Sequence, residues 1–79
     1  MEMGWWNRDA AGKKFQVHLE VFGGELLWRC QRKRHEPWVE YTAPTDDDWA
    51  KALELAENRL QRRLTTYAMV DKIRRRGVG

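Results

Sequence analysis

The fold of this chain is decided by residues 45–76, which read TDDDWAKALELAENRLQRRLTTYAMVDKIRRR. Apolar side chains recur in this stretch at steps of three and four, the spacing of one face of a 3.6-residue helix. They are Trp49, Leu53, Ala56, Leu60, Leu64 and Tyr67. Thr45 suits the N-cap position, because its hydroxyl can accept a hydrogen bond from a first-turn amide. No Gly or Pro follows until Gly77, so the sequence predicts a helical region over residues 45–76.

Residues 15–31 predict a β-hairpin that this helix can cover. Apolar and polar side chains alternate over residues 15–22, which is typical of a half-buried strand. Gly23-Gly24 follows, and two glycines between two such runs indicate a two-residue turn. That turn sets a register in which six apolar side chains share one face. The expected pairs are Val21 with Leu26, Leu19 with Trp28, and Val17 with Cys30.

A third strand is expected over residues 38–43, before Pro44 ends it. We place Val39, Tyr41 and Ala43 on the core side and Trp38 on the outer side. Residues 1–14 contain several turn-forming residues and are predicted to be irregular. The predicted fold class is therefore α+β: a three-stranded antiparallel β-meander, residues 15–43, packed on a long C-terminal helix, all in one domain of residues 1–79.

The predicted helix is too long for the predicted sheet. A helix of about 30 residues spans about 45 Å, whereas a strand of about eight residues spans only about 26 Å. The apolar residues beyond the reach of the sheet are Leu64, Tyr67, Met69, Val70 and Ile73. Three arrangements would resolve the mismatch. The helix breaks near Thr65-Thr66 and folds back, it stays straight and packs on a second copy, or its overhang binds another protein.

Composition and length exclude several classes of protein. The chain has 79 residues and a single cysteine, Cys30, so it can form no internal disulfide. No basic start followed by an apolar run indicates a signal peptide, and no stretch approaches the roughly 18 apolar residues of a membrane span. We expect a cytoplasmic protein with no membrane partner.

The sequence offers little that favours catalysis or cofactor binding. Cys30 is expected to face the core and His18 the solvent, so they cannot converge on a metal or form a nucleophile–base pair. The acidic residues 46–48 fit a helix N-terminus, where negative charge is favoured. Gly23-Gly24 lies in a hairpin rather than between a strand and a helix, so it is not a phosphate-binding loop. We expect no catalytic residues, no metal, no cofactor, no small-molecule substrate and no enzyme activity.

The first functional hypothesis is a small protein-interaction module, acting as a homodimer or as a subunit of a larger assembly. Adjacent tryptophans near the N-terminus and the helix overhang would supply its contacts. The predicted interface residues are Trp5, Trp6, Leu64, Tyr67, Met69, Val70 and Ile73.

The second hypothesis is a nucleic-acid-binding protein that uses the outer sheet face. Basic side chains there would contact phosphates, and Trp38 would stack on bases. The candidate residues are Arg29, Gln31, Arg32, Lys33, Arg34 and Trp38. A three-stranded sheet followed by a helix, over roughly residues 15–64, resembles in architecture the arm-type DNA-binding domains of phage integrases and AP2-type domains. The resemblance implies that the outer sheet face enters the major groove.

Overall fold

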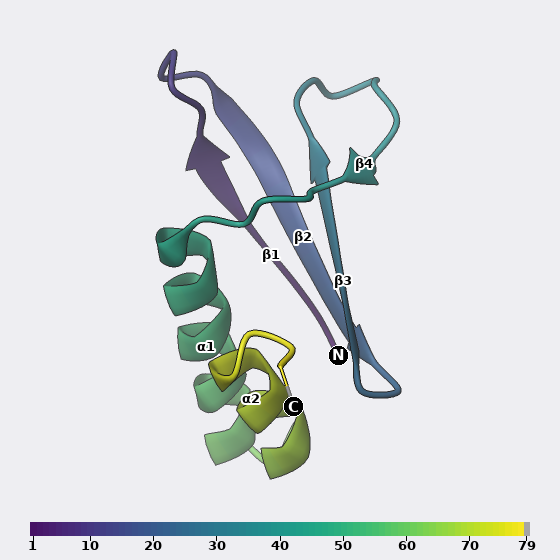
Figure 1. Ribbon diagram of the computed structural model, residues 1–79, viewed down its shortest axis with the longest axis vertical. Helices are drawn as coiled ribbons and strands as arrows, with labels where there is room; N and C mark the ends of the chain where they lie inside the picture. The colour runs from purple at the N-terminus through teal and green to yellow at the C-terminus, as the bar shows by residue number, and fades with distance from the viewer. Residues whose placement is uncertain (79) are drawn as a thin grey trace.

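Six elements make up residues 1–78, the part of the chain that the computed structural model describes. They are β1 (Glu2–Arg8), β2 (Lys14–Phe22), β3 (Glu25–Gln31), β4 (Val39–Glu40), α1 (Asp46–Gln61) and α2 (Tyr67–Arg74). The strands form one antiparallel sheet in the order β1-β2-β3-β4, and both helices lie against one face of it (Figure 1). The α+β class is confirmed, but the sheet has four strands rather than three and the single long helix is replaced by two.

The hairpin around Gly23-Gly24 has the predicted register. Val21 pairs with Leu26, Leu19 with Trp28, and Val17 with Cys30. Both glycines have positive φ angles, 58° and 80°, which side chains with a Cβ adopt only at a cost. The hairpin therefore follows from local sequence alone.

The prediction of an irregular segment over residues 1–14 is wrong, because residues 2–8 form the edge strand β1. This strand pairs with β2 from Lys14 to Glu20. The turn between them is held by Asp9, whose Oδ1 accepts hydrogen bonds from the amides of Ala11 at 2.9 Å and Lys13 at 3.0 Å. Met3 is buried and Trp6 is exposed. Trp5 lies on the same face as Met3, and Trp6 lies on the opposite face, because side chains alternate along a strand. Two adjacent large apolar side chains therefore hid the apolar–polar alternation that is typical of a strand.

The predicted third strand is much shorter than expected. Only Val39 and Glu40 pair with β3, and the Tyr41 amide then donates to the Trp28 carbonyl at 3.0 Å. From there the chain crosses the inner sheet face to reach α1 (Figure 1), so that the Tyr41 ring contacts those of Phe15 and Trp28. Val39 and Ala43, which we placed on the core side, are exposed, because the helices do not extend to this corner.

The helical region breaks and folds back near the predicted position. Thr45 caps α1 as predicted, accepting from the Asp48 amide. After Gln61 the chain turns through Arg63, which has a φ of 60°, and Thr66 caps α2 by accepting from the Met69 amide. Neither described helix is long and apolar enough to cross a membrane.

The fold-back resolves the mismatch in length by placing α2 beside α1. Val70 and Ile73 of α2 are 0% and 1% exposed. They share one core cluster with side chains of β1, β2 and α1, namely Met3, Leu19, Val21, Ala52 and Ala56. The fold-back therefore buries Val70 and Ile73 within the chain, whereas Leu64 and Tyr67 remain exposed.

Candidate nucleic-acid interface

The sheet face opposite the helices, called the outer face below, carries two of the five tryptophans. Strand register places Trp6, Gln16 and Gln31 in one row across β1, β2 and β3. The next row contains Gly4 and His18, then Arg29 and its β4 partner Glu40. These side chains point away from the core, because alternate residues of each strand face opposite sides.

Trp6 lies at the edge of a groove on the outer face. Its side chain is 63% exposed, and the groove has a volume of about 380 Å³. The residues that line it are Trp6, Gln16, Gln31, Arg32, Lys33 and Arg34. Four of them were predicted as nucleic-acid contacts, while Trp6 had been predicted as a protein contact and Gln16 had been missed.

Trp38 lies on the outer face as predicted, with its ring against His18. The ring centroids are 5.9 Å apart and the planes are inclined by 64°. Trp38 remains 43% exposed. Trp6 lies diagonally from His18 in the register, and such diagonal neighbours are about 7–8 Å apart. The two tryptophans are therefore close enough to contact the same short stretch of a ligand.

Hydrogen bonds hold the basic loop after β3 in place. Gln31 Nε2 donates to the carbonyls of Arg34 at 3.2 Å and Glu36 at 2.8 Å. Gln31, which was predicted as a nucleic-acid contact, therefore secures this loop. Arg32 bonds Asp9 at 3.5 Å and lies 4.8 Å over the Phe15 ring, and its side chain is still 54% exposed, so these contacts orient the guanidinium without removing its charge from solvent.

Lys33 and Arg34 are basic side chains of the same loop that differ from Arg32 in their pairing. Both are exposed, and neither forms an ion pair with another residue within 1–78.

The charge of the outer face changes along the strands. Arg8 and Lys14 are paired in the register at the same end of the sheet as this loop, whereas Glu2 and Glu20 are paired toward the opposite end. The outer face is therefore basic at one end and acidic at the other.

The predicted protein-interface residues do not form one surface. Val70 and Ile73 are buried in the core, so the prediction that they form an exposed overhang is wrong, and Met69 is half-buried. Leu64 and Tyr67 are exposed where α1 turns into α2. Trp5 lies on the inner face, where its Nε1 donates to Asp48 Oδ1 at 3.0 Å, and Trp6 lies on the outer face.

Asp48 is a polar junction that sequence reasoning missed. This carboxylate is 1% exposed. It accepts hydrogen bonds from Trp5 Nε1, Asn7 Nδ2 at 2.8 Å, Tyr41 Oη at 2.5 Å and the Thr45 amide at 2.9 Å. Thr45 and Asp48 form a capping box that the sequence contains, but no spacing in the sequence indicates the bonds from β1.

Hydrogen bonds to the Asp48 carboxylate determine its protonation state. Burial raises the pKa of the Asp48 carboxyl, but the bonds from Tyr41, Trp5 and Thr45 outweigh burial and lower that pKa below its ordinary value of 3.8. Burial, together with the bond to Asp48, raises the pKa of the Tyr41 phenol well above its ordinary value. Asp48 is therefore ionised and Tyr41 protonated at neutral pH, which suits a structural role.

Neither the arrangement of potential metal ligands nor similarity to known proteins indicates a further candidate function. Among residues 1–78, no three His, Cys, Asp or Glu side chains lie together in a way that could hold a metal ion. No protein-family model, curated protein or solved structure matches the chain.

Proposed function

We propose that this is a non-enzymatic protein that binds single-stranded nucleic acid across its outer sheet face. The observation that carries the proposal is the exposed Trp6 ring in a groove shared with Lys33 and Arg34, on a face that no helix covers. Trp38 supplies a second exposed ring on the same face. Aromatic rings that stack on bases, set beside cations that contact phosphates, are typical of single-strand-binding surfaces.

The width of the sheet favours a single strand over the major groove of a duplex. Strands lie about 4.8 Å apart, so four of them span about 14 Å between the outer backbones. The major groove of B-DNA is only about 12 Å wide. At β4, which contains only Val39 and Glu40, this width argues against the docking implied by arm-type and AP2-type domains. In a duplex, base stacking would also keep Trp6 from the base faces.

The binding test uses a fluorescent oligothymidylate of about 10 nucleotides, a length within the range that such surfaces cover. Fluorescence anisotropy should show affinity falling on the order of 50-fold between ~0.05 M and ~0.2 M salt if four phosphates are contacted. Trp6→Ala should weaken binding by about 1–3 kcal/mol through lost stacking, whereas Trp6→Phe should retain most of the affinity. The double variant Lys33→Ala/Arg34→Ala should lower the slope of log affinity against log salt by about 1.4.

The matched control is Lys51→Ala/Arg62→Ala, which removes the same charge from exposed positions in and directly after α1. It should bind as the unmodified protein does, because these residues belong to the helical layer. Equal losses in the two double variants would indicate non-specific attraction to net charge and would refute the proposed site. A duplex of the same length that bound more tightly than the single strand would refute the single-strand preference.

A further inference from the structure

Strand β3 has an open edge on the side of β4. Only Arg29 and Cys30 pair with β4, and the bond from the Tyr41 amide to the Trp28 carbonyl is the last contact before the chain turns toward α1. Within residues 1–78, no strand lies beside residues 25–27 on this side. An uncovered edge is a template for pairing with another extended chain.

The direction of the free backbone groups follows from that last contact. The Trp28 carbonyl points toward the β4 side, because it accepts from Tyr41 there. Along a strand, alternate residues direct their N–H and C=O groups to the same side. Leu26 and Trp28 therefore present amides to the open edge, while Leu27 directs its amide to β2. Within residues 1–78, no backbone group accepts from the Leu26 or Trp28 amide on the open side.

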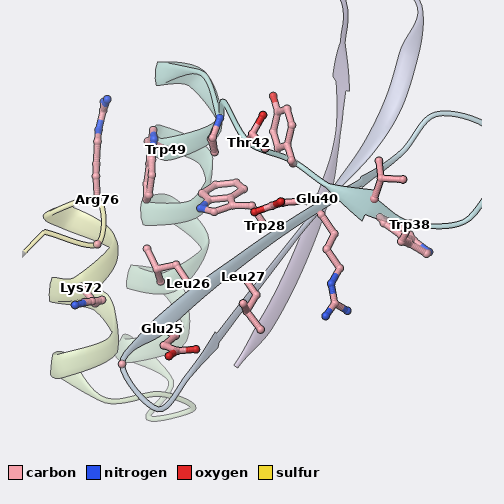
Figure 2. A pocket seen from close by; sticks show the side chains of 16 residues that line it. Glu25, Leu26, Leu27, Trp28, Trp38, Glu40, Thr42, Trp49, Lys72 and Arg76 are labelled. Atoms are coloured by element: carbon pink, nitrogen blue, oxygen red, sulfur yellow. The ribbon is translucent and has the colours of Figure 1, made fainter.

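This edge borders a groove of about 760 Å³. Six of its lining residues concern the argument, namely Leu26, Trp28, Val39, Trp49, Lys72 and Arg76. Figure 2 shows Trp28 and Trp49 between the helices and the sheet, with Lys72 and Arg76 on the helix side and Trp38 on the far side. Trp28 Nε1 is also buried without a hydrogen-bond acceptor among the described residues. The groove thus combines apolar surface with the free backbone amides of Leu26 and Trp28 along its edge.

The charges in the groove suggest where an acidic group would bind. Arg76 bonds Asp46 at 2.8 Å, and Arg29 lies opposite Glu40 in the register. Lys72, by contrast, forms no ion pair with any residue within 1–78. Glu25 lines the hairpin end of the groove, so attraction for an acidic group is confined to the helix side.

We propose that this groove binds an extended peptide segment of a partner protein, which adds to β3 as a further strand. The segment directs an apolar side chain toward Trp28 and Trp49 and an acidic side chain toward Lys72. Its backbone bonds the free groups of Leu26 and Trp28. Strand addition of this kind takes affinity from main-chain bonds and specificity from alternate side chains. This proposal does not rest on the proposed nucleic-acid function, although Trp38 borders both surfaces.

A short peptide fits the edge better than a second copy of this chain does. The open stretch is about three residues, or roughly 10 Å, because β4 closes one end and the Gly23-Gly24 turn closes the other. Two antiparallel β3 edges would bring β4 of one copy against that turn in the other. A second copy is nevertheless a distinguishable outcome of the test below.

The test measures amide hydrogen exchange by NMR with the probe acetyl-Thr-Ile-Thr-Glu-Thr-amide at millimolar concentration. Its second and fourth side chains share one face, as the groove requires. Exchange at Leu26 and Trp28 should slow about tenfold, while Leu27, already bonded to β2, serves as the internal control. No slowing at Leu26 or Trp28 at millimolar peptide would overturn the proposal. Protection that rises with protein concentration in the absence of peptide would assign the edge to a second copy and also overturn it.

Two variants of the probe test the mode of binding. One is N-methylated at its odd positions and the other at its even positions, so each lacks alternate N–H donors. Strand addition requires that only one of the two N-methylated probes lose binding. Equal affinities of the two probes would indicate a side-chain pocket and refute strand pairing.

The charge of Lys72 is tested separately. Lys72→Glu should weaken binding several-fold, and a probe with Lys in place of Glu should restore it, with exposed Lys51→Glu as control. Peptide binding should survive Trp6→Ala, so failure here and failure of the nucleic-acid proposal are distinguishable.

Discussion

At the scale of single residues, Asp48 does the most to join distant parts of the chain. Its carboxylate receives side chains from β1, from the crossing segment after β4 and from the cap of its own helix. Trp5 and Asn7 are 43 and 41 positions away in sequence. A buried charge is tolerated only where hydrogen bonds compensate its lost hydration. This junction therefore determines where α1 begins relative to the sheet.

We expect Asp48→Asn to lower the free energy of unfolding at pH 7 by about 2–4 kcal/mol. The asparagine oxygen can accept from only two of the four donors, and its NH2 group would face the other two. The exposed neighbour Asp47→Asn is the control and should change stability by less than about 0.5 kcal/mol. Urea denaturation monitored by tryptophan fluorescence measures both. Equal effects of the two substitutions would contradict a structural role for Asp48.

The same variant has a defined dependence on pH. Because the folded pKa of Asp48 lies below 3.8, its stabilising contribution is complete above that value and disappears as pH falls through the folded pKa. The difference in stability between the unmodified protein and Asp48→Asn should therefore be constant from pH 7 to about pH 5 and shrink below about pH 4. A difference that stayed constant down to pH 2 would show that the carboxylate does not titrate with folding.

At the scale of elements, the break between α1 and α2 divides the apolar residues of one periodic stretch between core and surface. Ile73 is 1% exposed and Leu64 is 66% exposed. Ile73→Ala should cost about 2–5 kcal/mol of unfolding free energy because it leaves a cavity, whereas Leu64→Ala should cost less than about 0.5 kcal/mol. Thermal or urea unfolding compares them. Similar small costs would mean that α2 does not pack on the sheet, as in the straight-helix arrangement.

At the scale of the whole molecule, the fold-back removes the basis for self-association through a helix overhang. The Cα radius of gyration is 12.7 Å and the longest extent is 35 Å, whereas an unbroken helix over residues 45–76 would alone span about 48 Å. Light scattering after size exclusion should therefore give the monomer mass of 9.5 kDa at both ~0.1 M and ~0.5 M salt. A dimer at both salts would restore the interface hypothesis and point to Leu64 and Tyr67.

The candidate site was only partly accessible from sequence. Lys33 was placed on the outer face because the hairpin register could be worked out from Gly23-Gly24, with Arg34 in the adjoining loop, and Trp38 was placed there by the alternation of the predicted third strand. Trp6 could not be placed there, since its strand was unrecognised. Gln31 was assigned to the ligand, although its amide secures the following loop. Side-chain roles of this kind depend on which backbone carbonyls come within reach, and no spacing in the sequence reports that.

The sequence by itself determined the features that depend on neighbours along the chain. These are the β2–β3 hairpin with its register, the Thr45 cap and the helical periodicity. The tertiary structure decided between the open arrangements of the helical region, and it decided that residues 2–8 pair as β1, that α2 covers the core and that Asp48 collects its donors. The bonds to Asp48 require residues 41 and 43 positions apart in sequence to meet. Burial of the shared apolar faces of sheet and helices brings them together, and that burial belongs to the folded molecule rather than to any local stretch.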